Sequence, residues 1–332
     1  MRGRWAAVSG ALLPAALLVS QPAAAHAFKL VQVDLVTGAA TGKMPRAKTI
    51  AEEGATVTLE PATIRRGEGE DADDYPIYRI TVTLPGHAPF VVPADEGRLD
   101  VHGVHVGVGR LAKGDPAPVV ILEGYSGGMH CCGTFQMIAA VGDAVGDSGG
   151  GAVKMLPLAG IDGGAGDHFP RDLDGDGVRD IERQDDAFRY AFASGAGSWS
   201  PPVIYDLRGG ALVDVSAEPR YARVWERYAA KVLKYCRPAN KFERNGACAA
   251  YAAAMGRMGR GAEGIKVAVA FAQPIAGFLP TPCRVVPNKD DGCPDGQEVE
   301  FGGFEPALRW FLDTTGYVSD PSVRALPPLP AK

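Results

Sequence analysis

The chain lacks long apolar runs after its first 27 residues, and it has no excess of positive charge. No later segment reaches the roughly 20 apolar residues that a membrane-spanning helix needs. The 34 lysines and arginines are outnumbered by 39 aspartates and glutamates, which gives a net charge of −5, and no basic cluster stands out. We therefore expect no transmembrane segment beyond an N-terminal leader, and no nucleic-acid partner.

Residues 1–27 have the features of a secretory signal peptide. Arg2 and Arg4 form a basic start, Ala11–Val19 forms an apolar core, and Ala25-His26-Ala27 offers a cleavage site. No cysteine lies near this junction, so a lipid anchor is not expected. Loss of the two arginines with the leader would change the net charge from −5 to −7. The sequence predicts a periplasmic or secreted protein.

Fixed-period repeats are also absent, which argues against a solenoid. The 43 glycines and 26 prolines are instead typical of a β architecture with many turns. Alternating apolar residues predict several strands, and Gly209-Gly210 predicts a hairpin. The clearest strands are Tyr78–Leu84, Val101–Val108, Pro118–Leu122 and Phe135–Val141. We expect an α+β protein whose larger part, residues 28–216, forms antiparallel sheets in a propeller- or sandwich-like arrangement.

After Ser216 the apolar period changes from that of a strand to that of a helix. Ser216 is expected to cap a helix with one apolar face, made of Tyr221, Val224, Trp225, Tyr228, Val232 and Leu233. The alanine-rich segment Gly246–Met258 predicts a second helix, and Phe304–Leu312 predicts a short last one. We expect a smaller helical part over residues 217–318 and a disordered, proline-containing tail over residues 319–332.

The six cysteines fit an exported chain, because disulfides are stable outside the cytosol. Proximity in the sequence predicts two bridges, one between Cys236 and Cys248 and one between Cys283 and Cys293. The first of these would staple a helical hairpin. The remaining two, Cys131 and Cys132, are adjacent. They form either a vicinal bridge or bridges to distant partners, and the second arrangement would change the other pairings.

An acidic segment over residues 172–180 has the spacing of a calcium loop. Aspartates stand at positions 1, 3, 5 and 9, and Gly177 stands at position 6, where a sharp turn is needed. The carboxylates repel one another until a divalent cation neutralises them. We therefore expect this segment to bind Ca²⁺, with one carbonyl ligand from Val178 and side-chain ligands from Asp172, Asp174, Asp176 and Asp180.

The loop departs from a helical EF-hand at position 12, where Arg183 stands in place of the bidentate glutamate. The last coordination sites are left to water, Glu182, Asp185 or Asp186. Alternation over Phe188–Phe192 predicts a strand after the loop. We expect a loop between strands that binds Ca²⁺ with a dissociation constant in the roughly micromolar to millimolar range.

This segment resembles the calcium loops of integrin-type propeller repeats, the FG-GAP or VCBS class, which read DxDxDGxxD and run into a strand. The resemblance implies the ligand set named above, and a single copy does not imply a whole propeller. A wider resemblance links three segments to uncharacterised exported bacterial proteins with the same order of blocks. These segments are Tyr125–Cys132, Asp172–Phe192 and Leu212–Ser216. This wider resemblance implies a shared β scaffold and export, and it implies no known activity.

Two short motifs leave a serine hydrolase as an alternative function. Ser126 lies in a G-x-S-x-G segment like that of a nucleophile elbow, and Ser148 lies in a GDSGG segment like that of chymotrypsin-like proteases. The elbow requires a following helix and a late histidine, whereas the last histidine in the chain is His168. Both motifs therefore lack their usual context.

A thiol-redox or soft-metal role is a second alternative, because His130, Cys131 and Cys132 are consecutive potential ligands. Neighbours on a strand point to opposite faces, so they chelate poorly. Our main expectation is an exported, calcium-stabilised binding or structural protein. Its partner is an unknown protein or envelope component, and we do not expect catalysis.

Overall fold

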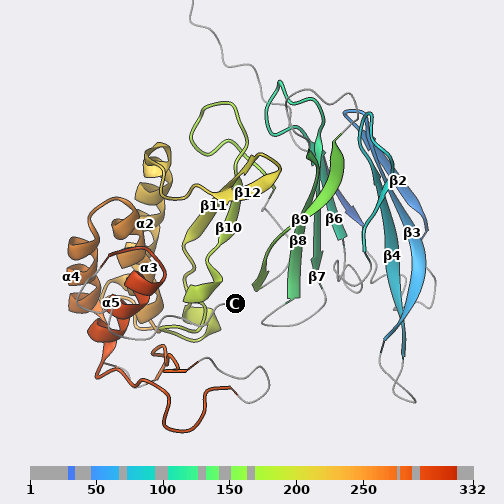
Figure 1. Cartoon of the computed structure of the whole chain (residues 1–332). Coiled ribbons are helices and arrows are strands. Elements are labelled where there is room, and N and C mark those ends of the chain that lie inside the picture. The colour runs from blue at the N-terminus through green and yellow to red at the C-terminus, as the bar shows by residue number, and fades with distance from the viewer. Residues whose placement is uncertain are drawn as a thin grey trace, which may run out of the picture.

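The computed structural model describes residues 29–33, 46–66, 73–93, 104–125, 132–141, 151–162, 169–274, 277–285 and 292–319. The predicted signal peptide and residues 320–332 of the predicted tail lie outside these ranges. The described residues form layers in the order of a four-stranded sheet, a five-stranded sheet, a three-stranded sheet and a group of helices (Figure 1). The predicted α+β class, with antiparallel sheets followed by a smaller helical part, is confirmed.

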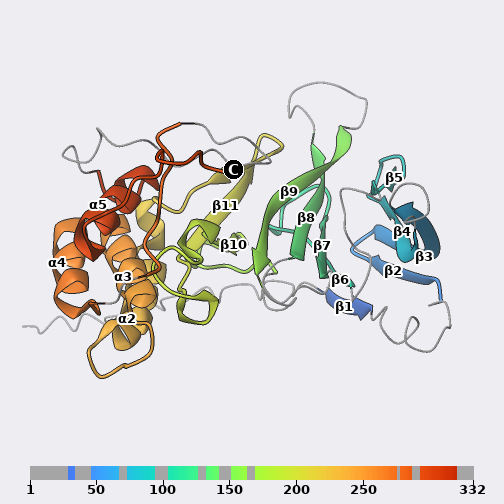
Figure 2. The same cartoon turned by 90° about the horizontal axis from the view of Figure 1, so that it is seen from below.

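The first two layers are antiparallel sheets. The four-stranded sheet has the order β2-β3-β4-β5, with bounds Lys48–Glu52, Ala55–Arg66, Asp73–Thr83 and Phe90–Val91. The five-stranded sheet has the order β1-β6-β7-β8-β9, with bounds Lys29–Val33, Val104–Gly109, Val119–Tyr125, Cys132–Val141 and Ala152–Asp162. Of the two expected arrangements, the structure has the sandwich, as the turned view also shows (Figure 2).

Alternation along the strands explains why these two sheets face each other. Val57 and Leu59 on β3 and Val106 on β6 are buried in one shared apolar core, together with Val120 and Leu122 on β7. The intervening residues of β7 face the other way. Because side chains alternate across a strand, β7 contributes to a core on each face of its sheet.

The second core lies between the five-stranded and three-stranded sheets. The latter consists of β10 (Ile181–Gln184), β11 (Pro202–Arg208) and β12 (Ala211–Asp214). Ile121, Phe135 and Ile181 are buried in this core. Gly209 and Gly210, with φ of 57° and 76°, form the turn of the β11–β12 hairpin, as predicted.

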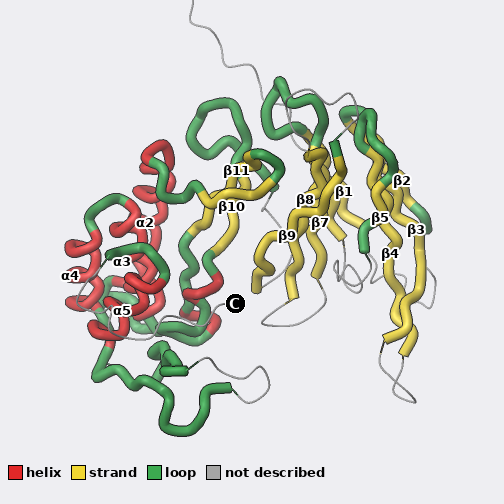
Figure 3. Tube along the Cα trace, in the orientation of Figure 1, coloured by secondary structure: helices red, strands yellow, loops and turns green. Residues whose placement is uncertain are grey.

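The helical part contains α2 (Ala222–Cys236), α3 (Asn245–Arg257), α4 (Gly261–Phe271) and α5 (Phe304–Thr314). Helix α3 is central, because every residue from Asn245 to Met255 is buried. Its small alanine side chains allow α2 and α4 to pack closely against it. Figure 3 shows α3 lying among the other helices. Disulfides join Cys236 to Cys248 between α2 and α3, and Cys283 to Cys293, so both predicted pairings are confirmed.

Three local predictions were wrong or incomplete. The expected strand over residues 188–192 is a 3₁₀ turn, η2 (Asp186–Phe188), followed by Tyr190 with φ of 58°. Ser216 does not cap a helix: its hydroxyl oxygen accepts a hydrogen bond from the Ile204 amide at 2.8 Å, and a 3₁₀ turn, η4 (Pro219–Tyr221), precedes α2. Helix α4 was not foreseen.

The predicted domain boundaries at residues 27, 216 and 318 stay predictions. In the structure the last strand ends at Asp214 and α2 begins at Ala222. Among the helices of the described ranges, none has both the length and the apolar character needed to cross a bilayer.

Candidate metal centre

The acidic loop lies where the three-stranded sheet begins. Its ends are joined by a pair of backbone hydrogen bonds between Arg171 and Asp180, at 3.0 and 2.9 Å, and β10 follows directly. Arg179 ties the loop to the connection between β6 and β7, because its amide donates to the Leu111 carbonyl at 2.8 Å and its guanidinium donates to the Arg110 carbonyl at 3.0 Å. The loop is therefore anchored to two sheets.

The loop's own side chains organise its turn. Asp172 accepts hydrogen bonds from the amides of Gly175 at 2.7 Å and Gly177 at 3.1 Å, and Asp174 accepts one from the Asp176 amide at 3.0 Å. Both glycines have φ near 90°, a conformation that other residues rarely adopt. The sequence spacing thus folds the backbone around the first aspartates.

Three of the predicted ligands converge. One carboxylate oxygen from each of Asp172, Asp174 and Asp176 lies within 4.8 Å of the other two. Calcium binds oxygen at about 2.3–2.6 Å, so oxygens that share one ion lie no more than about 5 Å apart. The separations in this group fit that limit, and carboxylate oxygens are the ligands that Ca²⁺ prefers.

Of the two remaining predicted ligands, Asp180 is not a member of this group. Asp180 is fully buried, and its carboxylate accepts hydrogen bonds from the Tyr221 hydroxyl at 2.6 Å and from the Leu173 amide at 2.8 Å. Burial raises the pKa of Asp180 above its ordinary value, although both hydrogen bonds oppose this shift. The Val178 amide donates to Asp176 at 2.7 Å, and ligation by the Val178 carbonyl stays a prediction.

The residues considered for the last coordination sites bond elsewhere. Arg183, at position 12, is buried, and its guanidinium lies 4.2 Å from the centre of the Phe135 ring. Burial lowers the pKa of Arg183 to about 10. The three acidic candidates pair with other side chains: Glu182 with Arg171, Asp185 with Tyr317, and Asp186 with Arg189.

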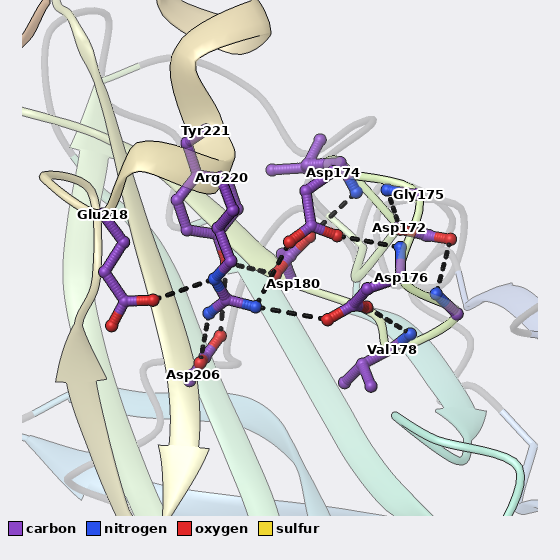
Figure 4. Close-up of polar contacts among 12 residues, drawn as sticks. Asp172, Asp174, Gly175, Asp176, Val178, Asp180, Asp206, Glu218, Arg220 and Tyr221 are labelled. Carbon is purple, nitrogen blue, oxygen red and sulfur yellow. Dashed lines mark hydrogen bonds and ion pairs between the residues drawn. The ribbon is translucent and has the colours of Figure 1, made fainter.

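A positively charged arginine side chain, which the sequence did not predict at this site, lies beside the loop. The Arg220 guanidinium, from the 3₁₀ turn η4, contacts Asp174 and Asp176 through Nη1 at 3.3 Å each (Figure 4). The same group bonds Asp206 at 2.6 Å and Glu218 at 2.8 Å. Arg220 therefore bridges the loop, strand β11 and the approach to α2.

A second guanidinium shares two of these carboxylates. Arg208 bonds Asp206 at 2.6 Å and Glu218 at 2.9 Å, and its bonds involve no residue of the loop. Arg208 and Arg220 together face four carboxylates, and Asp172 adds a further negative charge next to them. Negative charge thus exceeds these two cations around the loop, which suits a divalent cation.

Most residues of the alternative functions lie outside the described ranges: Ser126, His130, Cys131 and Ser148, together with the side chain of Cys132. Strand β7 ends at Tyr125, and the next described element is another strand, β8, that pairs with it antiparallel. A nucleophile elbow would continue into a helix there. The hydrolase and thiol alternatives stay predictions without support from the described fold.

The fold and the loop together define a β-sandwich protein with an acidic turn beside a small, disulfide-stapled helical domain. Residues 223–316, which run from α2 to just past α5, match the family model described as the sll0997 C-terminal domain. The chain is 27% identical over 251 residues to a probable thylakoid lumen protein, sll0997, of Synechocystis sp. (strain ATCC 27184 / PCC 6803 / Kazusa), covering 75% of this chain and 71% of that protein.

A second similar protein is the uncharacterized protein y4bJ of Sinorhizobium fredii (strain NBRC 101917 / NGR234). The identity is 29% over 208 residues, which is 60% of this chain and 30% of that protein. No solved structure matches the chain at a significant level. The likeness to sll0997 extends from the helical domain into the sheets, because 251 residues exceed the helical part.

Proposed function

We propose that this chain is an exported protein in which Ca²⁺, bound by Asp172, Asp174 and Asp176, fixes the junction between the sheets and the helical domain. Its role is to bind a partner or to support the envelope. The observation that carries the proposal is the convergence of three carboxylate oxygens within 4.8 Å of one another. They lie in a loop with the DxDxDGxxD spacing of FG-GAP calcium loops.

Export is supported by three independent features. Residues 1–27 have the composition of a signal peptide, and the described residues include two disulfides, which persist in oxidising compartments. A protein similar over 75% of this chain is described as a probable thylakoid lumen protein. The Ca²⁺ concentrations found outside the cytosol are high enough to occupy a site of modest affinity.

The position of the loop supports a stabilising role for the ion. Asp180 is bonded to Tyr221 at the entry to α2, and Arg179 is bonded to the connection between β6 and β7. An ion that draws the first three aspartates together would hold the loop between these two attachments. Because Ca²⁺ would bind the folded chain and not the unfolded one, it would stabilise the fold by linkage.

Isothermal titration calorimetry on the purified protein without residues 1–27 tests the proposal. We expect one Ca²⁺ to bind with a dissociation constant in the roughly micromolar to millimolar range. Asp172→Asn with Asp174→Asn removes two charges and leaves one amide-accepting oxygen on each side chain, so the affinity should fall at least about tenfold. Asp295→Asn, at an exposed residue that is distant from the loop in the sequence, is the control and should bind as the wild type does. Absence of binding at about 10 mM Ca²⁺, which is above the dissociation constants of the weakest extracellular calcium sites, would contradict the proposal.

A further inference from the structure

Arg220 holds its acidic partners at two different distances. Its bonds to Asp206 and Glu218, at 2.6 and 2.8 Å, are short charge-assisted hydrogen bonds. Its contacts with Asp174 and Asp176 are both 3.3 Å, which is longer than such bonds usually are. The side chain is thus anchored by β11 and the turn before α2, and it reaches toward the loop from that anchor (Figure 4).

The outer oxygens of the loop are the ones that Arg220 contacts. In Asp174 and Asp176, Oδ1 accepts a backbone amide from within the turn, and Oδ2 faces the guanidinium. The amide bonds shape the loop and carry no net charge. The guanidinium carries a full positive charge, so it is the contact that a bound metal ion would oppose.

Distance limits how far an ion could stay from this charge. An ion ligated by Oδ2 of Asp174 or Asp176 would lie about 2.4 Å from that oxygen, and Arg220 Nη1 lies 3.3 Å from it, so ion and nitrogen would be at most about 6 Å apart. Repulsion between a divalent and a monovalent cation at about 6 Å weakens binding roughly tenfold even at the dielectric constant of water.

We propose that Arg220 is a built-in competitor of Ca²⁺ at this loop: its guanidinium neutralises Asp174 and Asp176 in the ion-free protein, and Ca²⁺ binds by taking their Oδ2 atoms from it. The inference rests on the proposed calcium binding and adds how that binding is regulated. Asp206 and Glu218 keep the released guanidinium paired, so the exchange leaves no charge unpartnered. Arg220 precedes Tyr221, whose hydroxyl bonds Asp180, so the exchange takes place at the entry to α2.

Arg220→Gln tests the competition, and Arg208→Gln is a matched control. Both arginines bond Asp206 and Glu218, but the bonds of Arg208 include none to the loop. We expect Arg220→Gln to bind Ca²⁺ about tenfold more tightly than the wild type in calorimetry at fixed ionic strength. Arg208→Gln should stay within about threefold of the wild type, because its charge is farther from the ion. In chelator, Arg220→Gln should melt at a lower temperature than the wild type, since the loop loses its counter-ion.

The results separate this inference from the proposed function. If the wild type binds Ca²⁺ and Arg220→Gln binds it with equal or lower affinity, the competition is overturned and the calcium site still stands. An equal gain in Arg208→Gln would also overturn it, because a general change of charge would then explain the result. Binding by Arg220→Gln alone, with none by the wild type, would support the competition and contradict calcium binding by the natural chain. Binding by neither protein would overturn both.

Discussion

At the scale of single residues, the contact between Tyr221 and Asp180 joins the acidic loop to the helical domain. Both side chains are fully buried, and the hydroxyl donates to the carboxylate at 2.6 Å. A buried carboxylate is costly unless donors surround it. Burial raises the pKa of the Tyr221 hydroxyl, and the hydrogen bond to Asp180 raises it further, so this group stays protonated and donates its hydrogen bond throughout the ordinary pH range.

Tyr221→Phe removes this donor and leaves an Asp180 oxygen without its partner. We expect the free energy of unfolding to fall by about 2 kcal/mol, the usual cost of an unsatisfied buried acceptor. Urea denaturation followed by circular dichroism measures it. Tyr235→Phe is the control, because Tyr235 is 45% exposed, and its loss should change stability by less than about 0.5 kcal/mol. A Tyr221→Phe protein as stable as the control would show that the bond contributes little.

The residues of the loop were predictable from sequence, whereas their partners were not. The aspartate spacing and Gly177 predict a turn that brings Asp172, Asp174 and Asp176 together, and their carboxylate oxygens do converge, because the geometry of the turn is local. Arg220 lies 46 residues from Asp174 and 44 from Asp176, and Tyr221 lies 41 residues from Asp180. No periodic pattern links positions so far apart. Such contacts depend on how β11 and α2 pack, which a spacing rule does not contain.

At the scale of secondary-structure elements, the bridge between α2 and α3 fixes the helical core. Cys236 and Cys248 are both fully buried, and their Cα atoms are 4.6 Å apart. Cys236 is the last residue of α2, and Cys248 lies in the first turn of α3. The bridge therefore closes the helical hairpin beside the most buried helix of the domain.

Replacing both of these cysteines by alanine should lower the free energy of unfolding by about 2–4 kcal/mol, because the unfolded chain gains freedom and a small cavity opens in the core. Replacing Cys283 and Cys293 by alanine releases a loop of similar length but leaves no cavity at a fully buried site, so the loss should be smaller. Differential scanning calorimetry of the two double variants compares them. An equal or larger loss in the second variant would contradict the assigned core position of the first bridge.

Local sequence chemistry decided which elements could be foreseen. Gly209-Gly210 predicted its hairpin because few residues adopt the positive φ of that turn. The alternation over residues 188–192 predicted a strand that the structure does not have. Phe188 and Phe192 instead pack against Phe311 of the helical core from an irregular segment. Helix α4 was missed because Gly261 and Gly264 disfavour a helix locally, whereas packing against α3 stabilises it.

At the scale of the whole molecule, the acidic loop lies where the sheets meet the helices. Its Arg179 backbone and side chain are bonded to the β6–β7 connection, its buried aspartate is bonded to Tyr221, and its outer aspartates face Arg220. The order of the layers places this junction between the sandwich and the helical domain (Figure 1). A change in the charge of the loop should therefore alter the stability of both the sandwich and the helical domain.

Thermal unfolding of the protein without residues 1–27, in excess chelator and in about 10 mM Ca²⁺, tests the central claim most directly. With a dissociation constant near 0.1 mM, linkage would stabilise the fold by about 2.7 kcal/mol and raise the melting temperature by roughly 5 °C. Asp172→Asn with Asp174→Asn should reduce this rise to about half or less, and Asp295→Asn should keep it. Identical melting curves of the wild type in chelator and in Ca²⁺ would contradict the account.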